Sequence, residues 1–131
     1  MDTNVLRECL ALAMSNRMTF PETVARMHDT GVERYDADLS RMEKRYYAGD
    51  GSTHTDPIPL AGAPAVPREF SCEGVRDAIQ AIQRREIDYP EFLRRIMHAG
   101  TAGYTVYLEG RKAVYFGRSG DSHVEPFTPA N

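Results

Sequence analysis

The sequence has no tryptophan, only two cysteines and no long apolar run. Cys9 and Cys72 do not occupy matching places in the chain, so free thiols are expected rather than a disulfide framework. No stretch reaches the ~18 apolar residues of a spanning helix. The N-terminus lacks the basic start and apolar stretch of a signal peptide. These absences predict a cytoplasmic protein with no membrane partner.

A strong charge of either sign is also missing. Lys and Arg total 16 and Asp and Glu total 19, which gives a formal net charge of -3. This balance argues against a nucleic-acid partner. The sequence also has no phosphate loop, dinucleotide fingerprint, His-Glu-x-x-His or Cys-x-x-Cys motif, so it indicates no cofactor.

The chain does contain an internal repeat. When each residue is compared with the residue 69 positions later, 11 of the 56 pairs from Asp2/Ser71 to Pro57/Pro126 are identical. Typical residue frequencies give about 3 by chance. The first copy spans 1–57 and the second 70–131, and a proline-rich linker, 58–69, joins them. We expect the two copies to form one compact domain.

Each copy reads as two helices followed by three strands. Asp2 and Ser71 stand where the first helix of each copy needs an N-cap. The second helices begin at Thr19-Phe-Pro-Glu22 and Asp88-Tyr-Pro-Glu91, which are capping boxes with proline in the first turn. Gly31 and Gly100 are expected to end these helices in a left-handed conformation. Alternating segments separated by turn residues then indicate antiparallel meanders.

The predicted fold is therefore α+β, a tandem duplication of an ααβββ unit related by a pseudo-two-fold axis. The copies would share one sheet or pack sheet to sheet, which protects exposed strand edges. Val114 and Phe116 make the second copy apolar on both faces, so we expect it to supply the central sheet. The first copy is expected to form a solvated surface, because this region holds Asp36, Asp38, Glu43, Lys44 and Arg45.

A repeated Gly-x-x-His-x-acid-Pro pattern is the sharpest candidate for chemistry. It places His54 two residues before Asp56 and His123 two residues before Glu125. Residues two apart on a strand share a face. If the copies bring these four side chains together, they could bind a divalent metal or use the carboxylate to orient a catalytic histidine. The alternative is a turn glycine, an ion pair at a strand end and a proline that ends the strand.

Two further sets of residues leave a functional and a structural interpretation open. The matched tyrosines could line a pocket or pack as core against the helices; they are Tyr35, Tyr46, Tyr104 and Tyr115. The arginine pairs near the second inter-helix turn could bind phosphate or a partner's acidic face, or lie on solvated helix faces; they are Arg84, Arg85, Arg94 and Arg95.

The run from Tyr104 to Pro126, together with Asp88-Tyr-Pro-Glu-Phe92, resembles the YdfO/YbcV-like family. These are small bacterial and prophage-borne proteins that often carry the label "phage envelope protein". The resemblance implies a compact α+β fold, a soluble product and a bacterial or prophage origin. It implies no activity, so no catalytic residues carry over.

Three functions follow as hypotheses. The first is a non-enzymatic protein that binds a protein partner or a small ligand through its more polar first copy. The second is a metal-dependent or histidine-based enzyme centred on His54 and His123. The third is a nucleic-acid binder that uses the arginine pairs, against which the net charge argues. The oligomeric state is left open.

Overall fold

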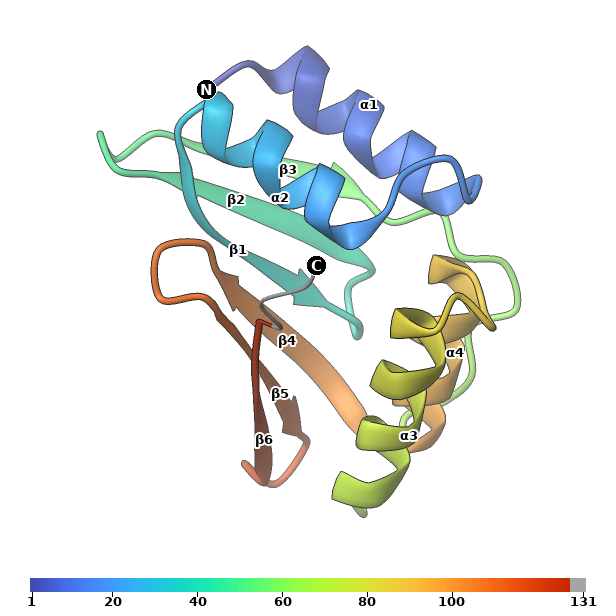
Figure 1. The fold of residues 1–131 in the computed structure, drawn as a ribbon. Coiled ribbons are helices and arrows are strands. Elements are labelled where there is room, and N and C mark those ends of the chain that lie inside the picture. Colours follow the sequence, from blue (N-terminus) through green and yellow to red (C-terminus); the bar gives the residue numbers. More distant parts are fainter. Residues whose placement is uncertain (128–131) are drawn as a thin grey trace.

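The computed structural model describes residues 1–127, which form four helices and six strands. The chain order is ααβββ twice, so the structure is α+β and fits a duplicated unit (Figure 1). The elements of the first copy are α1 (Thr3–Met14), α2 (Phe20–Asp29), β1 (Val32–Asp38), β2 (Glu43–Ala48) and β3 (Thr53–Pro57). Those of the second copy are α3 (Cys72–Gln83), α4 (Tyr89–His98), β4 (Thr101–Tyr107), β5 (Lys112–Gly117) and β6 (Ser122–Pro126).

All six strands belong to one antiparallel sheet in the order β3-β2-β1-β4-β5-β6. The copies join where β1 pairs with β4. In this register Tyr35 lies opposite Val106 and Ala37 lies opposite Tyr104. Each of these pairs is the other's counterpart at an offset of 69 residues, so a pseudo-two-fold axis runs through the sheet centre.

Backbone geometry repeats at the same offset. Outside the connector, the residues with positive φ form four pairs. Gly31 and Gly100 follow the second helices, as expected for left-handed residues after a helix end. The other pairs are Asn16/Arg85, Met42/Arg111 and Gly51/Gly120.

The helix starts agree with the sequence. The side chain of Asp2 caps α1 and that of Ser71 caps α3. Thr19 and Glu22 form a full capping box on α2. Asp88 caps α4 from one side only, while Glu91 pairs with arginines instead of reaching back to the N-cap.

The helices lie over one face of the sheet, and the core lies between them (Figure 1). α2 contacts β1 and α4 contacts β4, while α3 reaches the edge strand β6. Alternate residues of each strand point into this layer, which gives the alternating burial of β2 and β5. The opposite face holds half-buried or exposed side chains, including Tyr107, Phe116 and Val124.

The sheet corrects one expectation. Its central strands are β1 and β4, one from each copy, so the second copy does not supply the centre alone. Asp36, Asp38, Glu43 and Arg45 do lie on the uncovered face, opposite to the buried Lys44. The strand order depends on which strands pair across the pseudo-two-fold axis. The polarity of a single strand does not reveal that pairing.

The connector from 58 to 71 contains no helix or strand. Its first residue is nevertheless part of the core, since Ile58 is 4% exposed and its N–H donates to the carbonyl of Met42. Within residues 1–127, none of the helices combines the length and apolar character needed to cross a bilayer.

Candidate functional site: a central cavity with a buried lysine

A cavity of about 1070 Å³ lies between the helices and the sheet. Its floor comes from both copies, with Tyr35 and Lys44 from β1 and β2 and Tyr104, Ala113 and Tyr115 from β4 and β5. Small-ligand sites commonly have volumes of about 300–1,000 Å³, so this cavity can hold a sizeable organic molecule.

Lys44 is the unusual residue of the floor. It is 2% exposed, yet among residues 1–127 no carboxylate lies within 4.0 Å of its ammonium. Asp56 stands opposite Lys44 in the β2–β3 register, but its Oδ1 instead accepts a 2.8 Å hydrogen bond from His54. The other oxygen of Asp56, Oδ2, is buried and has no hydrogen-bond partner among residues 1–127. Burying a cation without a carboxylate at salt-bridge distance costs free energy.

Within residues 1–127, the close partners of the ammonium are two aromatic rings. Its nitrogen lies 4.6 Å from the ring centroid of Tyr35 and 5.2 Å from that of Tyr89. Such cation–π contacts offset part of the desolvation of the charge. They leave the three N–H donors of the ammonium available to an acceptor that enters the cavity.

The tyrosines around Lys44 stay uncharged. Burial raises the pKa of Tyr35 and of Tyr104 well above the ordinary value, and neighbouring tyrosines, first of all Tyr89, add to the shift. Burial likewise raises the pKa of Tyr115. The hydroxyls of Tyr89 and Tyr104 share a short hydrogen bond. At neutral pH this wall therefore offers phenol groups, which can donate to a bound oxygen atom.

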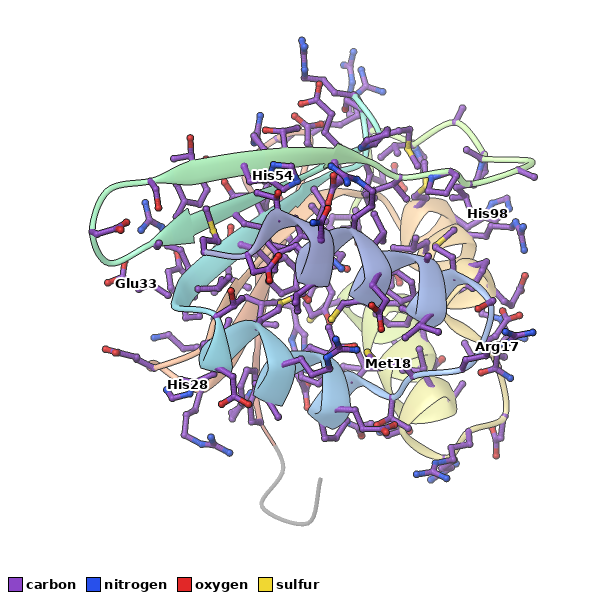
Figure 2. The ribbon with its side chains drawn as sticks, turned by 90° about the horizontal axis from the view of Figure 1, so that it is seen from above. Arg17, Met18, His28, Glu33, His54 and His98 are labelled. Atoms are coloured by element: carbon purple, nitrogen blue, oxygen red, sulfur yellow. The ribbon has the colours of Figure 1, made fainter. Side chains whose placement is uncertain are left out.

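The rim of the cavity comes from the two inter-helix loops, which are counterparts in the duplication. Asn16 and Arg17 belong to the first loop, and Arg85 and Glu86 belong to the second. Figure 2 labels Arg17 and Met18, which follow α1. Glu22 and Asp88 also line the cavity, but both are occupied as helix-capping groups. Charges of both signs stand at the rim, and the sheet contributes the buried Lys44 from β2 and the half-buried Glu125 from β6.

Lys44 is not among the site residues predicted from the sequence, because the polar residues around it led us to expect a solvated surface there. The structure shows this assignment to be wrong, since Lys44 faces the helices with Tyr46 and Ala48. Strand alternation indicates that Lys44 is on the buried face, because it lies two residues before Tyr46 and corresponds to the buried Ala113 in the second copy. The four candidate tyrosines are all buried, and Tyr35, Tyr104 and Tyr115, but not Tyr46, line the cavity.

The two histidine–carboxylate pairs do not meet. His54 and Asp56 lie on β3 and His123 and Glu125 on β6, which are the opposite edges of the sheet. Five strand spacings of about 4.8 Å separate these edges along the sheet, so the pairs cannot share one metal ion. Residues 1–127 contain no group of three or more His, Cys, Asp or Glu side chains arranged to hold a metal. Figure 2 shows His54 beside α1, well apart from His28 and His98.

Each pair instead forms a local contact. His54 Nε2 lies 2.8 Å from Asp56 Oδ1, and His123 Nε2 lies 3.0 Å from Glu125 Oε1. Arg7 of α1 adds a longer contact to Asp56, 3.9 Å from its Nε. The shared pattern therefore fixes the same hydrogen bond at each edge of the sheet.

The arginine pairs do not make one basic surface. Arg94 and Arg95 both contact Glu91 on their own helix, and the Nε of Arg94 also donates to the carbonyl of Ala61. Arg85 lies at the cavity rim and Arg84 is exposed. This arrangement adds no support for a nucleic-acid interface.

No protein-family model matches this chain, and no curated protein matches it either. The resemblance to the YdfO/YbcV-like family therefore stays a prediction.

Proposed function

We propose that this is a binding protein whose central cavity holds, without transforming it, a small organic anion with an apolar or aromatic body. The observation that carries the proposal is Lys44, a buried cation that faces a large cavity without a carboxylate within 4.0 Å among residues 1–127. An anionic ligand would supply the missing counter-charge. The aromatic and aliphatic lining would take up the rest of the molecule.

The charge sets the preference for an anion. A hydrogen bond to a charged group contributes about 1.5–3 kcal/mol, which corresponds to roughly 10- to 150-fold in affinity. Tyr89 lies beside Lys44, and its hydroxyl shares one hydrogen bond with that of Tyr104, so one O–H of the pair remains to donate to the same oxygen atoms. A carboxylate, sulfonate or phosphate on a planar or aliphatic body fits this chemistry.

The test uses two fluorescent probes of similar shape. Anilinonaphthalene sulfonate carries a negative charge, and N-phenylnaphthylamine is its neutral relative. The native protein should bind the anionic probe at least about 10-fold more tightly, in line with one charged hydrogen bond. Lys44→Met should remove that preference and leave the affinity for the neutral probe nearly unchanged.

Lys112→Met is the matched control, because Lys112 is exposed and lies on β5, three strands away from β2 and outside the cavity lining. It should alter neither affinity. Far-UV circular dichroism and urea denaturation must show that both variants are folded, since the anionic probe also binds loosened proteins. Equal binding of the anionic probe by the native protein and Lys44→Met would refute the proposal.

A further inference from the structure

Cys72, His123 and Glu125 come together at the outer edge of the second copy. The sulfur of Cys72 lies 3.4 Å from Nδ1 of His123. The other ring nitrogen, Nε2, lies 3.0 Å from Oε1 of Glu125. A nucleophile, a base and a carboxylate that orients the base thus stand in hydrogen-bond contact, an arrangement that recurs on unrelated folds.

The carboxylate determines which nitrogen faces the thiol. An ionised carboxylate only accepts hydrogen bonds, so Nε2 of His123 must carry the proton that bonds to Glu125. In the neutral ring Nδ1 is then unprotonated and points at the sulfur, where it can take the thiol proton. Tyr115 lies opposite His123 in the β5–β6 register, with ring centroids 6.5 Å apart and ring planes inclined by 27°.

The start of α3 supplies donors beside the sulfur. Cys72 and Glu73 are the first two residues of this helix, and their N–H groups have no acceptor among residues 1–127. The next N–H, from Gly74, is taken by the Ser71 hydroxyl at 3.0 Å. Free N–H groups next to a nucleophile can stabilise the negative oxygen that forms when a carbonyl is attacked.

We propose that Cys72, His123 and Glu125 form a nucleophilic thiol centre that accepts an acyl group from an activated ester or thioester and transfers it to water. The sulfur attacks the carbonyl carbon, a C–S bond forms, and the thiol proton passes to Nδ1 of His123. The bond to the leaving oxygen or sulfur then breaks, and that atom takes the proton from His123. Water attacks the acylated Cys72 and gives a proton to His123, which returns it to the sulfur as the C–S bond breaks.

The surroundings of Cys72 favour a substrate with a good leaving group. The thiol is partly exposed, but it lines neither the central cavity nor the shallow depression near Asp36 on the other face of the sheet. Little binding energy is then available to help break an amide bond. Glu125 and Tyr115 also line the central cavity, whereas Cys72 and His123 do not. The proposed chemistry of the thiol needs no anion at Lys44, so this proposal does not rest on ligand binding in the cavity.

The first copy provides a natural comparison. His54 and Asp56 repeat the histidine–carboxylate contact at 2.8 Å, but Thr3 occupies the position of Cys72. The histidine–carboxylate contact occurs in both copies and so fits a structural role. The thiol of Cys72 occurs in the second copy alone. Substituting His54 tests the general effect of losing such a pair without touching the thiol centre.

The experiment follows p-nitrophenyl acetate in the Cys9→Ala background, which leaves one thiol. A burst of one p-nitrophenolate per chain is expected, and peptide mapping should place the acetyl group on Cys72. Cys72→Ala should abolish the burst. His123→Gln should slow it at least about 100-fold, the usual contribution of a general base. His54→Gln should leave it unchanged.

Glu125 is a positioning residue, so its variant needs a separate readout. The titratable groups against His123 are Cys72 from α3, Glu125 from its own strand and Tyr115 from β5. Glu125→Gln should shift the midpoint of the pH profile of acylation, whereas loss of a merely structural contact would lower the rate at every pH alike.

A measurement on the unmodified chain guards against variants that fail to fold. Iodoacetamide should alkylate Cys72 faster than it alkylates glutathione at neutral pH, and Cys9, which is 0% exposed, should react last. The proposal is overturned if Cys72 reacts no faster than glutathione, if the acetyl group sits on a lysine, or if His123→Gln and His54→Gln have the same effect.

Discussion

The hydroxyl of Thr105 donates a 2.8 Å hydrogen bond to the carboxylate of Asp36, and these residues are counterparts 69 positions apart. They stand directly opposite each other where β1 pairs with β4. In an antiparallel pair of duplicated strands, equivalent residues meet only on the symmetry axis. The contact therefore marks the axis of the molecule and links the two copies by side chains as well as by backbone.

Thr105→Val should weaken the junction, because it keeps the shape of the side chain and removes the donor. Net hydrogen bonds contribute about 1 kcal/mol, so urea denaturation should show a loss of roughly that size in the free energy of unfolding. Thr55→Val is the control, since Thr55 is exposed on β3 in the same row of the sheet. An equal loss in both variants would contradict a specific role for the Asp36 contact.

Gly31 and Gly100 should differ sharply in their tolerance of alanine, although both have positive φ, +90 and +100. A Cβ on Gly31 meets nothing within 4 Å, so Gly31→Ala should cost only the left-handed penalty of about 1–2 kcal/mol. A Cβ on Gly100 would lie 2.1 Å from the carbonyl oxygen of Glu69. Gly100→Ala adds backbone overlap and should cost roughly 1–3 kcal/mol more. Thermal denaturation of the two variants measures the difference, and equal costs would contradict the close approach.

The local signals of this fold are readable from the chain. Asp2, Ser71, Thr19 and Asp88 each begin a helix because their side chains accept backbone N–H groups, and that requirement is visible within four residues. The offset of 69 also survives in the sequence, since turns need particular residues. Such signals depend on short stretches of chain, which one sequence contains in full.

The site depends on contacts between distant residues, so less of it could be predicted. Cys72 and His123 are 51 residues apart and meet only because α3 lies against β6. Nothing near Cys72 in the sequence indicates that edge strand. Lys44 is different, because its alternation with Tyr46 and Ala48 predicts the buried face. The expectation that charged residues lie outside concealed this signal.

Glu22 should contribute stability that disappears in acid. Hydrogen bonds from the backbone and hydroxyl of Thr19 hold the pKa of Glu22 below its ordinary value of 4.5. A lowered pKa in the folded state means that the contribution is complete above pH 4.5 and is lost as the pH falls through the folded value. Glu22→Gln keeps a capping acceptor without a titrating group. Its stability should therefore fall less between pH 5 and pH 3 in urea titrations, about one unit either side of a carboxyl pKa; a parallel fall would exclude Glu22 as a source.

Lys44→Met should raise stability while it lowers the affinity for the anionic probe. The native side chain holds a desolvated charge whose close contacts are the rings of Tyr35 and Tyr89 in the described part of the chain. Methionine has a similar length and fills the same space without that charge. Mutational data give about 1–3 kcal/mol for burying a polar group without compensation, so the free energy of unfolding should increase by up to that amount.

The control for this change is again Lys112→Met, which removes an exposed charge and should alter stability by less than about 0.5 kcal/mol. Opposite changes in stability and anion binding would identify Lys44 as a residue kept for its ligand, as expected where a functional site is strained at the expense of the fold. If Lys44→Met instead destabilises the empty protein, the ammonium makes net favourable contacts in the core. Its burial would then be explained without any ligand.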